Sequence, residues 1–361
     1  MLVDRIEKVV NKRIKQGYDY LQTLRTLKGA DPREVWEHYK GYKTENAMKQ
    51  GIKNSYPAFP EPHSAFSQWR LTKESSGKVI EKIREKGYTS LCFLGCPILG
   101  NEHSKDLGQK VLLLDVDRET LNCVKSGVEK KVYDAYDNLP NDLAGKFSCV
   151  ITDAPWYLQD IKLFIVRASQ AAKQGGTIFF TTPGLLTRPS IVDERLEMQK
   201  WLSENNLIID NISEVEYETP AFEYMAYYDI PAFSGENWRV GSFVKLKKAE
   251  GPKDINSPAK EKTNWLEYKF DEKRVLLREI RGRRKEGTPK VEPVNEDESL
   301  VLKTVSRRST LIPKIDLWSS RNAVLHIASG YSAVKDILEN PYEYSGRHEE
   351  AAEQIRSFIA I

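Results

Sequence analysis

The chain has 361 residues, of which 40% are hydrophobic and 30% charged, and its formal net charge is +3. This length exceeds what one core usually organises, so we expect two domains and a terminal extension. The near-balanced charge is not typical of a dedicated nucleic-acid-binding protein. No apolar run approaches the roughly 20 residues that cross a bilayer, and the charged start of the chain lacks the apolar core of a signal peptide.

The cysteine usage is typical of a reducing cytoplasm. The four cysteines form no C-x-x-C pair, and no paired histidine spacing accompanies them, so we expect no metal site. Cys92 and Cys149 lie in apolar, strand-like runs and are expected to be buried. The sequence therefore predicts a cytoplasmic protein without a membrane partner.

Residues 1–71 are expected to form a helical extension and a linker. Apolar residues recur at helical spacing from Leu2 onward. Asp31 and Pro32 are typical of the N-cap and first position of a further helix. Three prolines within 57–62 indicate an extended linker.

Residues 72–250 alternate between short apolar, strand-like segments and helical ones, which predicts a parallel, doubly wound sheet. The expected strands are 89–95, 111–115, 131–134, 147–153, 177–181, 207–212 and 240–246. The last two are expected to pair without a crossover helix, which is typical of the antiparallel hairpin that closes a methyltransferase sheet. The predicted fold class is therefore α/β: a Rossmann-like methyltransferase fold with a mostly parallel seven-stranded sheet.

Residues 251–361 follow a polar, proline-containing stretch that is typical of a domain boundary. We expect strands at 265–281, 299–304 and 310–315 and helices at 332–339 and 348–359. This pattern predicts a small α+β domain.

A glycine and three aspartates end four successive predicted strands. They are Gly95, Asp115, Asp134 and Asp153. In an open parallel sheet, ligands bind beyond the carboxyl ends of the strands. Gly95 and Cys96 are expected to approach a nucleotide-like cofactor, Asp115 to accept bonds from the ribose hydroxyls, and Asp134 to accept from an adenine amino group.

Each of these residues also has a purely structural interpretation. Gly95 can form a simple turn, Asp115 can cap a helix over 118–124, and Asp134 can lie in a solvated loop. Asp117 and Asp137 are alternative carboxylates for the two binding roles.

The segment Asp153-Ala154-Pro155-Trp156-Tyr157 comes directly after a predicted strand. It resembles the Asp-Pro-Pro-Tyr/Trp signature of amino-group transferases. An attacking amine needs acceptors for its hydrogens, and the Asp153 carboxylate and the Ala154 carbonyl supply two. Pro155 stiffens the turn, and the two aromatic rings can pack on a planar base or a cation.

The sequence resembles the branched-chain polyamine synthase (bis-aminopropyl spermidine synthase) family over about Pro60 to Tyr228. The resemblance is carried by 60–62, 68–74, 93–95, 114–117 and 147–155. It implies a methyltransferase-like catalytic domain, a decarboxylated S-adenosylmethionine donor and a polyamine acceptor. After the first-strand glycine the family carries an acidic run that engages polyamine nitrogens, whereas this chain has Cys96-Pro97-Ile98. An apolar loop cannot neutralise a polycation by charge pairing.

The leading hypothesis is therefore an S-adenosylmethionine-dependent transferase that acts on an amino nitrogen, with methyl transfer placed first. One alternative is an aminopropyltransferase that makes branched polyamines. The other is a degenerate Rossmann module that binds nucleic acid or a protein without catalysis. The acceptor stays open among a polyamine, a nucleobase and a protein amine.

Two further groups of residues are candidates for binding. Tyr217, Phe222, Tyr224, Tyr227 and Tyr228 can line an acceptor pocket or belong to the core. Five arginines in the C-terminal region can contact nucleic-acid phosphates: Arg281, Arg283, Arg284, Arg307 and Arg308.

Overall fold

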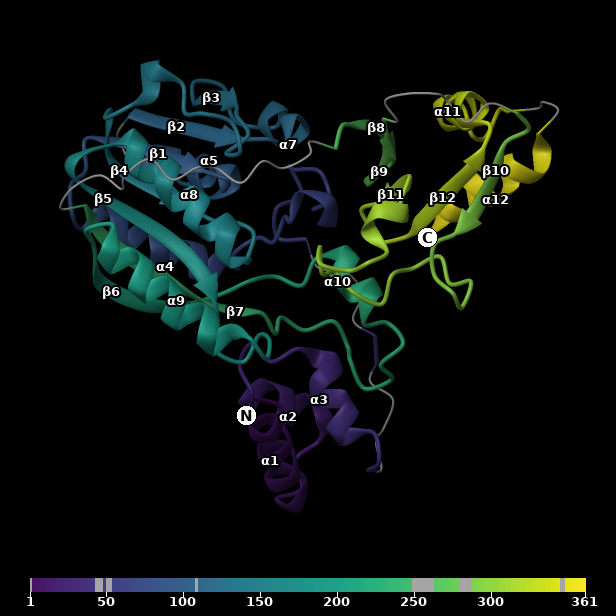
Figure 1. Ribbon diagram of the computed structural model, residues 1–361, viewed down its shortest axis with the longest axis horizontal. Helices are drawn as coiled ribbons and strands as arrows, with labels where there is room; N and C mark the ends of the chain where they lie inside the picture. The colour runs from purple at the N-terminus through teal and green to yellow at the C-terminus, as the bar shows by residue number, and fades with distance from the viewer. Residues whose placement is uncertain are drawn as a thin grey trace. The chain divides into compact units, whose positions relative to one another are not determined.

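The computed structural model describes residues 2–42, 48–49, 54–107, 110–248, 263–279, 287–344 and 348–361 (Figure 1). These residues form two compact units. The first contains the described residues of Met1–Gln50, Trp69–Thr219 and Ile230–Lys260, and the second contains those of Gly51–Gln68, Pro220–Asp229 and Glu261–Ile361. Within the described ranges, no helix is both long enough and apolar enough to cross a membrane.

A seven-stranded sheet with the order β3-β2-β1-β4-β5-β7-β6 forms the centre of the first unit. Its strands are β1 (Ser90–Leu94), β2 (Lys110–Asp115), β3 (Glu129–Val132), β4 (Phe147–Thr152), β5 (Ala172–Pro183), β6 (Leu207–Glu216) and β7 (Val240–Lys248). The first five run parallel, whereas β7 is antiparallel to both β5 and β6. The predicted fold class, a methyltransferase-like Rossmann sheet closed by an antiparallel hairpin, is confirmed.

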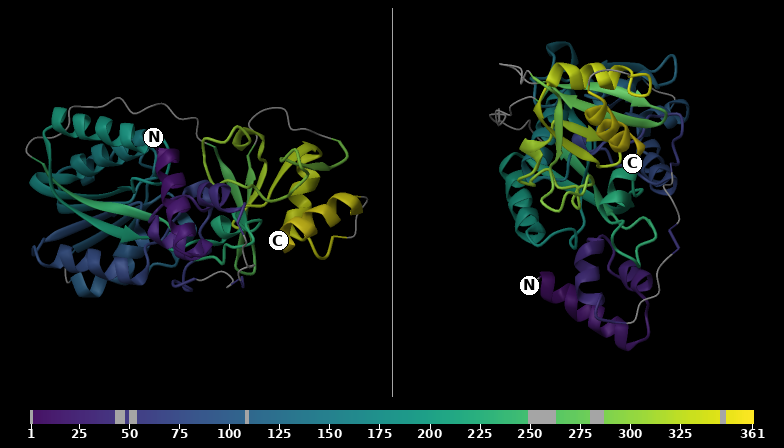
Figure 2. Two further views of the ribbon diagram at one scale, coloured as in Figure 1. Left: turned by 90° about the horizontal axis from the view of Figure 1, so that it is seen from below. Right: turned by 90° about the vertical axis from the view of Figure 1, so that its right-hand side faces the viewer.

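Helices cover both faces of this sheet (Figure 2). They are α4 (Lys73–Arg84), α5 (Pro97–Glu102), α6 (Ser104–Leu107), α7 (Arg118–Asn122), α8 (Leu158–Ala171) and α9 (Ile191–Glu204), with a 3₁₀ turn η2 (Asn141–Leu143). The Thr72 hydroxyl accepts a hydrogen bond from the Ser75 amide and so caps α4. The helix α8 ends at Ala171, and the following residues, including Gly175 and Gly176, lie inside β5.

The interior of the sheet explains why its central strands are so apolar. Cys92 in β1 and Cys149 in β4 have no exposed surface, as their apolar surroundings predict. The helix α5 lies directly on β1 and β2 because Gly100 has no side chain. A Cβ at Gly100 would stand 2.5 Å from a Leu113 methyl carbon and 2.7 Å from the Phe93 ring.

The N-terminal residues form three helices, as their periodicity predicts. These are α1 (Leu2–Lys15), α2 (Tyr20–Thr26) and α3 (Pro32–Tyr39). The Asp31 carboxylate accepts from the Arg33 amide at 2.8 Å and caps α3, with Pro32 in the first helical position. The buried Tyr20 hydroxyl donates to the Pro32 carbonyl at 2.8 Å and ties α2 to α3. These helices share the first unit with the sheet. The division into domains at 1–71, 72–250 and 251–361 stays a prediction.

A five-stranded antiparallel sheet with the order β10-β12-β11-β9-β8 forms the second unit. Its elements are η1 (Ser64–Phe66), α10 (Ala221–Ala226), β8 (Trp265–Phe270), β9 (Lys273–Arg278), β10 (Lys290–Pro293), η3 (Ile312–Lys314), β11 (Leu317–Ser319), β12 (Val324–Ser329), α11 (Tyr331–Glu339) and α12 (Glu349–Ala360). Residues from α11 and α12 pack against the sheet in one apolar core. This is an α+β arrangement.

Two expected strands in this region are wrong. In 299–304, Val301 makes only an isolated bridge to Ala323. In 310–315 the chain forms η3, because Pro313 has a fixed φ and no amide hydrogen for a ladder. The expected boundary at 250–262 lies outside the described residues.

The segment 317–322 binds Glu61 and His63, which precede the first sheet in the chain. The Ser320 hydroxyl donates to the buried Glu61 carboxylate at 2.6 Å, and Arg321 pairs with the same carboxylate at 3.2 Å. The His63 ring contacts the Trp318 carbonyl at 3.0 Å. This polar segment therefore has a structural role: it holds residues 61–63 within the second unit.

Candidate functional site

The carboxyl ends of the central strands meet at one edge of the first sheet. β1 lies between β2 and β4, and Leu94 stands opposite both Leu114 and Thr152. Gly95, Asp115 and Asp153 therefore emerge from three adjacent strands. The strand order reverses between β1 and β4, which is where ligands bind in doubly wound sheets.

The Asp153 carboxylate is held by two hydroxyl groups from distant strands. Its Oδ1 atom accepts hydrogen bonds from the Thr181 hydroxyl in β5 and from the Tyr217 hydroxyl, at 3.0 Å, directly after β6. Burial raises the pKa of Asp153 from 3.8 to about 6, and the two hydroxyl bonds offset part of that rise. At neutral pH this carboxyl is therefore ionised and has a set orientation.

Cys96 lies within electrostatic range of two of the predicted carboxylates. Burial raises the pKa of its thiol well above the usual value, and the charges of Asp153 and Asp115 raise it further. A protonated thiol is a poor nucleophile, so Cys96 serves the site as a small neutral residue. The structure thus brings Asp115, Cys96 and Asp153 together.

Gly95 has a positive φ of 72°. A Cβ there would lie 2.9 Å from the Phe164 ring and 3.1 Å from the Asp153 carbonyl oxygen. The turn and the packing of Phe164 therefore require glycine. These contacts seat the loop after β1 directly against the Asp153 backbone.

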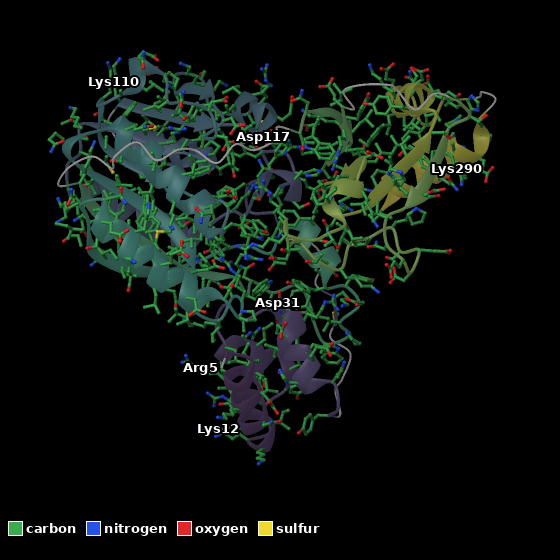
Figure 3. The ribbon with its side chains drawn as sticks, viewed as in Figure 1. Arg5, Lys12, Asp31, Lys110, Asp117 and Lys290 are labelled. Carbon is green, nitrogen blue, oxygen red and sulfur yellow. The ribbon has the colours of Figure 1, made fainter. Side chains whose placement is uncertain are left out.

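The carboxylates Asp115 and Asp117 have different roles. Asp117 is buried and caps α7, since it accepts from the Glu119 amide at 3.1 Å and from the Thr120 hydroxyl at 2.7 Å; Figure 3 labels it where β2 meets α7. Asp115 is half-buried, and its Oδ1 accepts from the Asp117 amide at 2.8 Å. The helix cap considered for Asp115 is thus formed by Asp117, and Asp115 stays the candidate for the ribose.

Asp134 follows β3, one strand further out. Its Oδ1 accepts from the Tyr136 amide at 2.9 Å, and its carbonyl accepts from the Asp137 amide at 2.9 Å. Its charge also contributes to the raised pKa of Tyr133, which burial takes to about 12. These contacts form a tight local turn. The adenine role of Asp134 stays a prediction.

The residues after Asp153 separate into three environments. Ala154 is buried in the core of the sheet. The Pro155 carbonyl accepts from the Tyr157 amide at 2.7 Å, which tightens the turn. The Trp156 ring meets the Tyr217 ring edge-on at 5.0 Å, whereas the Tyr157 ring lies 6.0 Å from the Arg188 guanidinium. Of the two predicted aromatic residues, Trp156 is thus the one that touches a partner of Asp153.

A buried arginine that the sequence analysis missed lies beside Trp156. The Arg239 guanidinium stands 4.6 Å from the Trp69 ring, 5.3 Å from the Trp156 ring and 4.6 Å from the Trp238 ring. Only 8% of Arg239 is exposed. We call these four residues the Arg239 cluster. Trp69 and Trp156 are far in the sequence from the adjacent residues Trp238 and Arg239. That adjacent pair is the one sequence feature that could have indicated the cluster.

Most of the remaining candidates belong to the second unit or lie outside the described residues. Of the five aromatic candidates, Tyr217 lies in the first unit, whereas Phe222, Tyr224, Tyr227 and Tyr228 belong to the second. Arg307 donates to the Ser67 hydroxyl at 3.2 Å, and Arg308 is exposed. The other three predicted phosphate contacts lie outside the described residues: Arg281, Arg283 and Arg284.

Comparison with known proteins agrees with the fold that the strand order indicates. Residues 103–267 match the family described as the branched-chain polyamine synthase A C-terminal domain. The chain resembles the branched-chain polyamine synthases. The structural similarity to solved members of that family covers a larger share of this chain than the family match does.

Two structures of the Thermus thermophilus branched-chain polyamine synthase, both in complex with N4-aminopropylspermidine and 5′-methylthioadenosine, are similar to this chain. The C9 mutein is 15% identical with a TM-score of 0.58, covering 72% of this chain and 90% of that chain. The second structure is 15% identical with a TM-score of 0.52, covering 68% and 87%. An uncharacterized protein of Methanocaldococcus jannaschii is 25% identical over 114 residues, which is 30% of this chain and only 28% of that relative's length. The structural similarity shows a shared methyltransferase-like fold.

Proposed function

We propose that this chain transfers an alkyl group from a sulfonium nucleoside, S-adenosylmethionine or its decarboxylated form, to an amino nitrogen. The observation that carries the proposal is the Asp153 carboxylate at the switch point, held through Oδ1 by Thr181 and Tyr217. With one oxygen occupied by two donors, the carboxylate orientation is set before an amine arrives. The rate gain comes from positioning, because the sulfonium is already a strong electrophile.

The donor fits the strand ends. Asp115, the half-buried carboxylate after β2, has the position of the group that accepts from ribose hydroxyls in nucleotide-binding sheets. Gly95 and Cys96 add no charge beside it. Asp115 and Asp153 are two carboxylates beside this neutral loop. They suit a cationic sulfonium, because both attract its positive charge.

Methyl transfer is the first form of this proposal. The branched-chain polyamine synthases, which this chain resembles, engage polyamine nitrogens with an acidic run after the first-strand glycine. The loop Cys96-Pro97-Ile98 has no carboxylate at that place. The thiol of Cys96 supplies no charge there either, since desolvation raises its pKa. An acceptor without a long polycationic chain therefore suits this site: a nucleobase or a protein amine.

Aminopropyl transfer is the second form, and the comparisons favour it. The similar Thermus structures hold N4-aminopropylspermidine and 5′-methylthioadenosine. 5′-Methylthioadenosine is what remains of decarboxylated S-adenosylmethionine after its aminopropyl group has left. Asp153 would then orient the polyamine nitrogen.

Calorimetric titration and mass spectrometry test both forms. S-Adenosylhomocysteine and 5′-methylthioadenosine are titrated into the protein, and each donor is then incubated with spermidine, adenine-containing oligonucleotides or lysine peptides. The proposal expects binding of at least one nucleoside and a mass gain of one methyl or one aminopropyl group that the Asp153→Asn variant does not produce. Absence of nucleoside binding by folded protein would overturn it and favour a non-catalytic module.

A further inference from the structure

We propose that Arg239 is a positioning residue for Trp156, and that the N-terminal helices α1–α3 hold Arg239 in place. The inference gives the helical extension a role in building the acceptor side of the site. Only its link to acceptor binding rests on the proposed function, because Trp156 belongs to the motif proposed to bind the amine.

Trp156 is confined on several sides. Its ring contacts the Tyr217 ring at 5.0 Å and faces the Arg239 guanidinium at 5.3 Å. It also lies on the backbone of Gly241, where an added Cβ would stand 2.7 Å from its Cζ2 atom. Two of these contacts come from residues 239 and 241 at the start of β7. A shift of this strand end would therefore move the indole.

Arg239 itself is confined by the indoles around it. The rings of Trp69 and Trp238 lie 4.6 Å from its guanidinium, and the side chain is buried. Trp69 comes from the segment before α4, and Trp238 immediately precedes Arg239. A planar guanidinium stacks on aromatic faces in a way that an ammonium group does not. The residue type therefore matches a role in holding rings.

The helical extension contacts the backbone on both sides of Arg239. The Gly29 amide donates to the Trp238 carbonyl at 3.1 Å. Gly29 has a φ of 80°, and a Cβ there would lie 3.1 Å from the Val240 carbonyl oxygen. Ion pairs flank this contact: Lys28 with Glu214 at 2.7 Å and Arg25 with Glu236 at 3.0 Å.

Figure 3 shows the direction of this contact. Asp31, two residues beyond Gly29, lies at the end of the extension toward β7, and Lys12 lies near the opposite end. The turn between α2 and α3 is thus the part of the extension that meets the Arg239 strand. The helices support the acceptor side of the site from outside the sheet.

The chain offers a matched pair of variants for the test. Gly29 and Gly17 are both in the extension and have nearly equal φ angles of 80° and 81°. A Cβ at Gly17 would meet no atom within 4 Å, whereas one at Gly29 would press on Val240. Gly29→Ala and Gly17→Ala therefore carry similar backbone strain, but only the first displaces β7.

Hydrogen–deuterium exchange of the peptide covering 153–160 is the primary measurement. The proposal expects a several-fold faster exchange in Gly29→Ala and in Arg239→Met than in the wild type, and no change in Gly17→Ala. Equal exchange in Gly29→Ala and Gly17→Ala would overturn it. Arg239→Lys serves as the second variant if Gly29→Ala does not fold, and wild-type exchange in Arg239→Lys would also overturn it.

Titration with S-adenosylhomocysteine separates this inference from the proposed function. If the wild type binds it, all four variants should keep the wild-type dissociation constant within about twofold, because Arg239 acts on the acceptor side. Loss of nucleoside binding in Gly29→Ala alone would overturn the inference. If the wild type binds neither S-adenosylhomocysteine nor 5′-methylthioadenosine, the proposed function fails, and the exchange measurement still decides the role of Arg239.

Discussion

Substitution of Asp153 by asparagine should stabilise the protein while it removes activity. Asparagine keeps an Oδ1 atom that accepts from Thr181 and Tyr217, but it removes the buried charge. Burial raises the pKa of Asp153 from 3.8 to about 6. A difference of one in pKa corresponds to about 1.4 kcal/mol, so the buried charge costs about 3 kcal/mol at neutral pH.

The pH dependence has a definite sign. Because the folded-state pKa of Asp153 lies above the unfolded value, the folded protein retains the proton over a range where the unfolded chain has lost it. The free energy of unfolding contributed by this group therefore falls as the pH rises from about 4 to about 6. The stability advantage of Asp153→Asn should grow over that window and stay level above it.

Urea unfolding of the wild type and Asp153→Asn at a series of pH values measures this difference. The exposed Asp142 supplies the control, since Asp142→Asn should change stability by less than about 0.5 kcal/mol throughout. Activity, once an acceptor is found, should rise with pH around 6 as the carboxylate ionises. An asparagine variant that is no more stable than the wild type at pH 8, with no pH dependence of the difference, would refute the reasoning.

Three further predictions follow from particular contacts. Tyr217→Phe and Thr181→Val should each raise the pKa of Asp153 further, because both hydroxyl bonds lower it, and should move the rising limb of the pH–activity profile upward; an unmoved profile would contradict this. Gly100→Ala should destabilise by about 1–3 kcal/mol, because its Cβ would stand 2.5 Å from Leu113. Gly77 in α4 has open space, so Gly77→Ala should stabilise by about 0.5–1 kcal/mol, and urea unfolding compares the two. Arg274→Met should destabilise the second unit by about 3–5 kcal/mol, because Arg274 is buried and its Nε and Nη2 donate to the Glu267 carboxylate at 2.7 and 3.0 Å; a loss below about 1 kcal/mol in chemical denaturation would exclude a dominant ion pair.

The prediction of the fold succeeded where local sequence is enough. The central strands β1, β2 and β4 are apolar runs bounded by polar residues, and the Asp31 cap of α3 is visible as a residue type in the sequence. Prediction failed at 310–315, where an apolar pattern contains Pro313. A strand pattern describes side-chain burial, whereas the backbone of a ladder needs amide hydrogens as well.

The candidate site was predictable in part for the same reason. Gly95, Asp115 and Asp153 follow parallel neighbouring strands, and strand direction alone brings their backbones to one edge. The choice between Asp115 and Asp117 was not predictable, because it depends on which carboxylate turns toward the α7 amides.

The sequence by itself determined the alternation of strands and helices, the closing hairpin, and the strand ends from which a site can be built, because hydrophobic period and capping chemistry act over a few neighbouring residues. Tertiary structure alone decided how Asp153 is held and what surrounds Trp156. Thr181, Tyr217 and Arg239 come from three different strands or strand ends, and their side chains meet only after the antiparallel hairpin has been added to the parallel sheet. No local pattern encodes such a meeting, since it depends on sheet order and register over many residues.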